Sequence, residues 1–339
     1  MINQRNSLVK SRLIVGGQCA CAVLLAMSAA QANDSTGYVG TGGVQYLKNN
    51  NISMHSEDLY ISKDKIRVNY EFKNLSNKDI TETVLFPLPP VPSQLESDFA
   101  DTTRLVDSFK ILSNGKAISP KTHVRTFMYP IVMKNGEKTY ADKAVDTTEL
   151  FKACGIKDSE MMTPWTNQGE TAKVDQKLQN CTDKRINKFI DVNEEDSYLS
   201  WDSQIVYSWQ QTFKANAITK INHTYRPLVG GSVHLDTSEY GDFCVDKATQ
   251  SAFVKNEIHP YQALSYILTT GANWAKPIGN FKLTVERDPN ELVSFCWKGK
   301  GKGKGKGKVK KVGPTTFEIK ETNFVPKHDF DVAFIMKTW

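Results

Sequence analysis

Cysteine is scarce in this chain, and the spacing of the few cysteines excludes the common zinc sites. The 339 residues include six cysteines, and Cys19 and Cys21 lie in an apolar run near the N-terminus. None of the other four has a second cysteine or a histidine at the C-x-x-C or similar spacing of zinc ligands. We therefore expect no bound metal ion.

Motifs of the well-known enzyme classes are also missing. The sequence has no G-x-S-x-G, no H-E-x-x-H, no P-loop and no G-x-G-x-x-G after a strand-like run. Its six histidines do not have the spacing of metal ligands. These absences favour a protein that is not an enzyme, and we expect no catalytic residues and no cofactor.

The excess of positive charge comes from two short segments, and the net charge of the whole chain is +6. Arg5, Lys10 and Arg12 lie near the N-terminus with no acidic residue between them. Eight lysines lie between residues 298 and 311, and the rest of the chain is mildly acidic. A nucleic-acid-binding protein spreads basic residues over one face with aromatic residues between them. We therefore expect no nucleic acid as a partner.

The N-terminus has the order of features that is typical of a secretory signal peptide. The basic residues precede the run LIVGGQCACAVLLAMSAA, and Ala30 and Ala32 then form an A-x-A pattern before polar residues. This order predicts that residues 1–32 are removed and that the exported chain begins at Asn33. An uncleaved membrane anchor is the alternative, although glycines interrupt the run. We expect a periplasmic or extracellular protein with no transmembrane span in its mature chain.

The remaining cysteines are expected to form disulfides, because an even number in an exported chain is typical of a disulfide framework. Four cysteines allow three connectivities. Sequence order favours two local pairs, Cys154 with Cys181 and Cys244 with Cys296.

Residues 33–137 are rich in strand-like patterns. Ile66, Val68, Tyr70 and Phe72 alternate with polar residues, which is the period of a strand with one buried face. The polar stretch NLSNKD and the run TETVLFP follow, so we expect two antiparallel strands joined as a hairpin. The Asn-Gly pair in ILSNGKAIS predicts another hairpin.

The pattern changes between residues 138 and 200 and then returns to strands. TTELFKACGI and DQKLQNCTDKRINKFI have apolar residues three and four apart, which predicts short amphipathic helices. Runs such as SQIVYSWQQTF, GNFKLTVER and DFDVAFIMK indicate strands between residues 201 and 339. We expect a mainly β protein with an antiparallel, immunoglobulin-like β-sandwich at 33–137, a mixed helical insertion at 138–200 and a C-terminal β unit at 201–339.

A repeat of lysine and glycine, KGKGKGKGKGKVKK, occupies residues 298–311. Glycine buries little surface and neighbouring lysines repel each other, so we expect an extended, solvated loop. One interpretation is a loop of slippage-prone repeats without a function. The other is an electrostatic contact with an anionic surface polymer or an envelope protein. The candidate contact residues are Lys300, Lys302, Lys304, Lys306 and Lys308.

An aromatic and polar set in the second half is the candidate platform for a ligand or partner. If residues 203–213 and 218–228 pair as a hairpin, Trp209 shares a sheet with His223 or Tyr225 and their rings can stack a ligand. The alternative is packing of these rings in the core, with His223 hydrogen-bonded. The set consists of Trp209, His223, Tyr225 and Trp274.

Two further segments resemble metal sites, each with a simpler alternative. His55, Glu57 and Asp58 could supply mixed ligands to a metal ion from one strand. On a regular strand, however, His55 and Glu57 share a face while Asp58 points away, so the alternative is a local salt bridge or a solvated start of the strand. Residues 191–202 alternate oxygen-bearing side chains but lack the central glycine and the final glutamate of a calcium loop. We expect a solvated acidic loop there.

Several stretches together resemble a family of secreted bacterial proteins, domain-of-unknown-function family 4424. They are NDSTG, ISMHSEDLYIS, VNYEFKN, VLFPLP, YSWQQTF, INHTYRPLVGG, YILTTGANWAKPIGNFKLTVE, LVSFCW and VGPTTFEIKETNFVPKHDFDVAFI. The resemblance covers nearly the whole mature chain and implies kinship without a known activity. The long lysine-glycine repeat departs from the family pattern, so the resemblance implies nothing about that repeat.

A shorter resemblance supports the sandwich. VNYEFKNLSNKDITETVLFPLP is similar to the opening of vault/inter-alpha-trypsin modules, which are β-sandwiches. Taken together, these features predict an exported envelope protein that acts as a binding or structural module for a protein or a surface polymer. The alternative is a periplasmic hydrolase that acts on cell-wall or glycan material.

Overall fold

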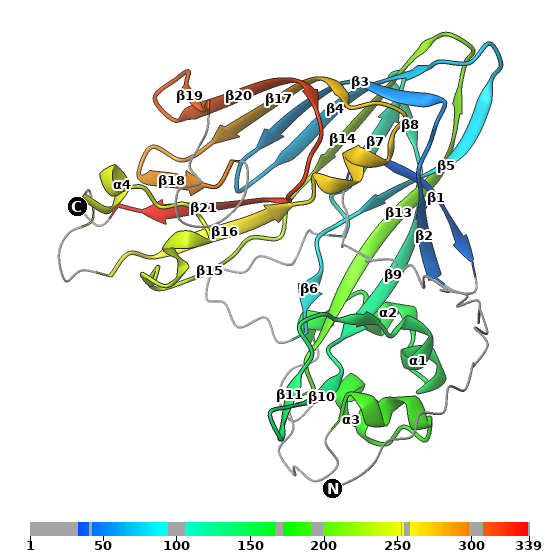
Figure 1. Ribbon diagram of the computed structural model, residues 1–339, viewed down its shortest axis with the longest axis vertical. Helices are drawn as coiled ribbons and strands as arrows, with labels where there is room; N and C mark the ends of the chain where they lie inside the picture. The colour runs from blue at the N-terminus through cyan, green and yellow to red at the C-terminus, as the bar shows by residue number, and fades with distance from the viewer. Residues whose placement is uncertain are drawn as a thin grey trace, which may run out of the picture.

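The computed structural model describes residues 33–40, 43–93, 106–166, 172–190, 199–251, 253, 258–297 and 308–337. The chain is mainly β, with several antiparallel sheets and a few short helices, as the sequence predicts. Two large sheets and one smaller sheet build the body, and three helices gather at the far end of two long strands (Figure 1). The predicted signal peptide, residues 1–32, lies outside the described residues.

The first sheet is organised by its longest strand, β13, which pairs with β9 on one side and β5 on the other. The short strand β6 (Val91–Pro92) also pairs with β13. In spatial order, this sheet contains β12 (Val145–Asp146), β9 (Lys121–Met128), β13 (Trp201–Phe213), β5 (Ile80–Pro87), β1 (Ser35–Gly40) and β2 (Gly43–Leu47).

The second sheet has eight strands, which come from both halves of the chain. In spatial order, it contains β19 (Lys310–Lys311), β20 (Thr316–Phe324), β17 (Ile278–Glu286), β3 (Ile52–Ile61), β4 (Ile66–Asn74), β14 (Ile218–Tyr225), β7 (Lys110–Ser113) and β8 (Lys116–Ile118). Neighbours are antiparallel except β3 and β17, which are parallel. The predicted alternation of β4 is confirmed, because its apolar side chains are buried at every second position.

A third sheet and a separate hairpin complete the β structure. The third sheet contains, in spatial order, β15 (Gly230–Ser232), β16 (Tyr261–Tyr266), β21 (Phe330–Met336) and β18 (Glu291–Phe295). The hairpin pairs β10 (Ile131–Lys134) with β11 (Glu137–Tyr140). The main core lies between the second sheet and the other two, because buried side chains of all three sheets form one cluster.

The helices lie mostly in the predicted insertion and have a small core of their own. They are α1 (Thr148–Ala153), α2 (Asp158–Met161), α3 (Lys173–Gln179) and α4 (Lys247–Ser251), with 3-10 turns η1 (Pro164–Thr166), η3 (Lys184–Lys188), η4 (Glu239–Gly241) and η5 (Thr269–Asn273). The insertion has its own buried cluster, which lies at the ends of β9 and β13 and includes Phe151, Leu178 and Trp201. Among the described residues, no helix combines the length and apolarity needed to cross a bilayer.

Both favoured cysteine pairs are at disulfide distance. Cys154 and Cys181 have an S–S distance of 1.97 Å, and they join the end of α1 to the turn after α3. Cys244 and Cys296 have an S–S distance of 2.02 Å, and they join the segment after η4 to the end of β18.

Two of the expected hairpins are wrong. β4 and β5 do not pair with each other, and neither do β13 and β14: β4 pairs with β14 in the second sheet, whereas β5 pairs with β13 in the first. Both connections therefore cross from one sheet to the other at the same corner, where Asn74 Nδ2 donates to the carbonyl of Phe213 at 2.9 Å. Turn residues predict where a strand ends, but they do not specify which sheet the next strand joins.

The hairpin predicted from the Asn-Gly pair is confirmed. Asn114 and Gly115 connect β7 to β8 with φ angles of 48° and 79°. Two consecutive positive φ values are those of the tight turn that the twist of a hairpin favours, and asparagine and glycine adopt them at the lowest cost.

Strands from the predicted segments 33–137 and 201–339 lie in the same sheets. β3 and β4 from the first segment lie beside β17 and β14 from the second. The main core likewise contains side chains from both segments. The predicted boundaries therefore mark stretches of the chain, with the helical stretch between them, and the sheets join these stretches into one body.

Candidate functional site

The structure places all four members of the predicted aromatic platform in the core. The exposed fraction is 5% for Trp209, 1% for His223, 3% for Tyr225 and 1% for Trp274. The Trp209 and His223 rings meet edge to face with centroids 5.4 Å apart, and they come from opposite sheets instead of one. Because the two strands face each other across the core, the rings pack as core residues and present no open stacking surface.

His223 belongs to a buried polar cluster that also contains the first described residues of the chain. Its Nε2 lies 2.9 Å from Oδ1 of Asp34, and both side chains are fully buried. Trp274 Nε1 donates to the carbonyl of Asp34 at 2.7 Å. Of the predicted platform, His223 and Trp274 therefore hold the Asp34 region in place.

Asn33 extends this cluster to β3 and β4. Its Nδ2 donates to Oε2 of Glu57 at 3.2 Å, and the Tyr70 hydroxyl donates to its Oδ1. The Tyr70 hydroxyl also lies 3.2 Å from that of Tyr266 on β16. A Cβ at Gly271 would lie 2.9 Å from Asn33 Nδ2, so a glycine at this position leaves room for the asparagine.

A β-bulge explains why Glu57 is buried while His55 is exposed. The register between β3 and β4 shifts between Met54 and Ser56, so the alternation of β3 changes phase there. His55 and Glu57 therefore do not share a face, and the expectation from a regular strand was wrong. The pKa of Glu57 is raised to about 8, mainly by burial and in part by the neighbouring Asp34. Its hydrogen bond with Asn33 acts in the opposite direction.

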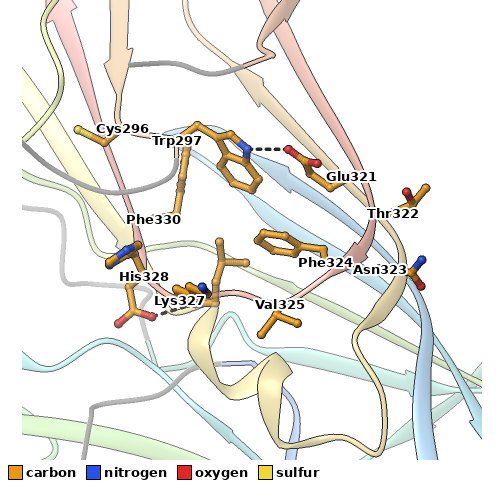
Figure 2. A pocket seen from close by; sticks show the side chains of 12 residues that line it. Cys296, Trp297, Glu321, Thr322, Asn323, Phe324, Val325, Lys327, His328 and Phe330 are labelled. Carbon is orange, nitrogen blue, oxygen red and sulfur yellow. Dashed lines mark hydrogen bonds between the residues drawn. The ribbon is translucent and has the colours of Figure 1, made fainter. Parts of the chain in front are cut away.

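Sequence reasoning missed an accessible pocket at the junction of the second and third sheets. It has a volume of about 330 Å³ and forms where β18 and β20 end and the chain turns into β21. Figure 2 shows the rings of Trp297 and Phe324 along one side, with Phe330 deeper on β21. Pockets of this size, apolar with a few polar groups, are typical binding sites for small ligands or for units of a polymer.

The aromatic wall of this pocket is rigid. The Trp297 ring packs against both Phe281 and Phe324, with centroid distances of 5.6 Å and 5.4 Å, and these two rings also contact each other at 4.7 Å. Its Nε1 donates to Oε1 of Glu321 at 3.2 Å, as the dashed line in Figure 2 shows. The preceding Cys296 is fixed by its disulfide. This wall is therefore held in one position before any ligand arrives.

Charged residues surround the opening of the pocket. Lys327 and His328 are exposed, and Asp329 is partly buried. Asp329 Oδ1 accepts hydrogen bonds from Thr269 Oγ1 at 2.8 Å and from the backbone at the start of η5, so it holds that turn in place. Lys327 forms no ion pair within 4 Å among the described residues, which leaves its charge directed to solvent at the pocket.

The predicted lysine contacts lie next to this pocket in sequence. Lys298 directly follows Trp297, and Lys308 is the first residue of the repeat that the structure describes and is exposed. The other four candidates, Lys300, Lys302, Lys304 and Lys306, lie outside the described residues, as does most of the predicted acidic loop at 191–202. The sequence signal that could have indicated this pocket is Trp297, which directly precedes the basic segment.

We also searched the described residues for catalytic and metal groups. They contain no cluster of three or more His, Cys, Asp or Glu side chains that could hold a metal ion. His123 Nε2 and Ser208 Oγ are 2.7 Å apart on the paired strands β9 and β13. Burial lowers the pKa of His123, and the neighbouring Lys121 lowers it further. Ser208 is only 5% exposed, whereas His123 is half-buried.

The comparison with known families agrees with the resemblance in the sequence. The family model described as "Domain of unknown function (DUF4424)" matches residues 32–333. The chain belongs to this family. No curated protein matches the sequence, and the description of DUF4424 names no activity.

One solved structure shows how far the likeness to known folds extends. A Legionella pneumophila protein, provisionally described as a nutrient binding protein, aligns with this DUF4424 chain at 16% identity and a TM-score of 0.43. The alignment covers 90% of this chain and 70% of the other. At this level of similarity, the comparison does not carry an argument about the ligand.

Proposed function

We propose that this protein is an exported, non-enzymatic binding module for an anionic polymer of the cell envelope. The observation that carries the proposal is the preformed pocket, which is lined by the half-buried ring of Phe324, held in place by the buried ring of Trp297. The chain loses its signal after Ala32 and acts in the periplasm or outside the cell. The two disulfide pairs support this location, because disulfides persist in oxidising compartments.

The chemistry of the pocket favours a charged sugar polymer. Aromatic rings present a flat apolar face to the carbon–hydrogen face of a sugar ring, and polar groups around the pocket can bond to its hydroxyls. Lys327 adds positive charge at the opening. The lysines of residues 298–311 follow Trp297 in the sequence and supply more positive charge for a polyanion.

The first test compares binding of the mature protein to polygalacturonate, an acidic polymer, and to dextran, a neutral one, by isothermal titration. We expect binding to polygalacturonate that weakens as salt is added. Phe324→Ala should weaken it about tenfold, because one stacked aromatic contact corresponds to about 1.4 kcal/mol. Lys327→Gln should weaken binding and reduce its dependence on salt.

Matched controls separate the pocket from the rest of the surface. Leu112→Ala and Lys116→Gln change an exposed apolar and an exposed basic side chain on the β7–β8 hairpin, at the opposite edge of the second sheet. Replacing residues 298–311 by a short Asn-Gly turn tests the lysine repeat separately. Equal losses in the controls and in Phe324→Ala would contradict the pocket, and capture of an envelope protein instead of polymer would assign the site to a protein partner.

The hydrogen-bonded pair of His123 and Ser208 keeps a hydrolase as the second candidate. A serine beside a neutral histidine is the arrangement of an activated nucleophile. Turnover of cell-wall or glycan esters that Ser208→Ala abolishes, while the variant keeps its fold, would favour this function. Turnover that is absent, or unchanged in Ser208→Ala, would leave the pair with a structural role between two strands.

A further inference from the structure

The first described residues are buried inside the protein, which is unusual for a segment at a predicted cleavage point. Asn33 and Asp34 have an exposed fraction of 0%. Their contacts reach β3, β4 and β14, together with Trp274 after η5. These two residues therefore connect both halves of the second sheet to the turn that precedes β17.

The surroundings of these residues contain more negative than positive charge. Asp34 and Glu57 are both buried carboxyl groups, and His223 is the basic side chain that contacts them within the described part of the chain. Asp34 Oδ2 has no hydrogen-bond partner among the described residues. A buried carboxylate without a cation is strongly destabilising, so Glu57 stays protonated near neutral pH unless a cation lies beside it.

We propose that the missing cation is the α-ammonium group of Asn33, created when the chain is cut between Ala32 and Asn33. This inference rests on the export processing in the proposed function, and it does not depend on the ligand. Asn33 Nδ2 lies 3.2 Å from Oε2 of Glu57. Covalent geometry keeps the backbone nitrogen of asparagine within about 5 Å of its own side-chain amide, so the new charge forms within about 8 Å of the Glu57 carboxyl group.

The chemistry of the cut supplies the charge. Hydrolysis of the peptide bond consumes one water molecule and leaves a carboxylate on Ala32 and an ammonium group on Asn33. The neutral amide had a single N–H donor, whereas the ammonium group has three. These donors can bond to Glu57 and to the unpartnered oxygen of Asp34. Asp34 keeps its hydrogen bond with His223 Nε2, and the ammonium group pairs with Glu57.

The cut therefore acts as a maturation switch. Before it, folding must bury Glu57 either as a protonated acid or as an unpaired charge. After it, the same folded structure contains an internal ion pair, and its stability rises. The shared family region begins at residue 32, so the cleavage point adjoins the region that the family has in common.

The experiment combines two changes in a double-mutant cycle. Four proteins are compared: the chain beginning at Asn33, the same chain preceded by Ala-Ala, and both forms with Glu57→Gln. Urea unfolding at pH 7 is followed by tryptophan fluorescence. We expect the two added alanines to lower the urea midpoint by about 1 M when Glu57 is present, because they remove the cation from a buried pair. In the E57Q background, the loss should be less than half as large.

A second measurement keeps the proposal testable if E57Q does not fold. The α-amine of the folded protein should resist acylation by an amine-reactive reagent, whereas it reacts in urea. A reactive α-amine in the folded protein would overturn the proposal. An equal loss of midpoint in both backgrounds would show a purely steric effect and would also overturn it, as would no loss at all.

Export and ligand binding are tested separately. Intact mass of the exported protein should correspond to a chain that begins at Asn33, and any other first residue rejects the switch. Binding to polygalacturonate should be the same in all folded forms, because the pocket lies on other elements. Failure of polymer binding would therefore not contradict the maturation switch, and failure of the switch would not contradict binding at the pocket.

Discussion

Replacing Glu57 by glutamine in the chain that still carries Ala32 measures the cost of an unpaired buried carboxyl group. In that chain a peptide bond precedes Asn33, as in the structure, and the pKa of Glu57 is about 8. The unfolded chain releases this proton near the ordinary value of 4.5. Between these pH values the folded state binds more protons than the unfolded state, so the free energy of unfolding falls as pH rises.

The magnitude follows from the difference between the two pKa values. One pKa unit corresponds to about 1.36 kcal/mol, so the rise from 4.5 to about 8 corresponds to a fall of up to about 5 kcal/mol. The stabilisation is complete below pH 4.5, decreases through the window and is lost above pH 8. Glu57→Gln removes the titrating group, so its stability should change much less over the same range.

The assay is urea unfolding from pH 4.5 to 8.5, with the difference between the two proteins plotted against pH. Asp34, Tyr70 and Tyr266, whose pKa values burial raises, are present in both proteins, so Glu57 is the one group of the cluster that the comparison removes. Glu137→Gln on the exposed hairpin is the matched control. A difference that does not change with pH would refute the reasoning, because Glu57 would then not titrate in this window.

Two further changes test the framework. Replacing Cys154 and Cys181 by serine opens a loop with a sequence separation of 27 and should lower the free energy of unfolding by about 3 to 4 kcal/mol, seen in the urea midpoint; an unchanged midpoint would contradict it. Gly279→Ala should cost about 1 to 3 kcal/mol, because its Cβ would lie 2.5 Å from the carbonyl oxygen of His55. Gly230→Ala, with nothing within 4 Å, should be close to neutral in the same assay.

Local sequence patterns predicted the positions of the strands well, but they predicted poorly which strands pair with each other. The alternation in β4 and the Asn-Gly turn between β7 and β8 depend on neighbouring residues, so the sequence shows them directly. The pairing of β4 with β14, and of β3 with β17, depends on residues more than a hundred positions away. No local pattern contains that information.

The candidate site shows the same division. His223 and Trp274 stood out as a polar and aromatic pair, but their burial depends on which sheet faces them. A bulge between Met54 and Ser56 turned Glu57 inward, which a regular period of two cannot predict. The pocket at Trp297 forms from the ends of strands in two different sheets, so its residues converge only in the folded protein.

The parallel contact between β3 and β17 also constrains the order in which the chain can assemble. It joins residues 224 positions apart, as the contact between Lys282 and Asp58 shows. A chain delivered from its N-terminus completes β3 and β4 early and must then wait for β17, so one edge of β3 stays unpaired for most of synthesis or transport. Such an edge can pair with other chains. The second sheet is therefore expected to form slowly, because β3 cannot complete its pairing until residue 286 is available.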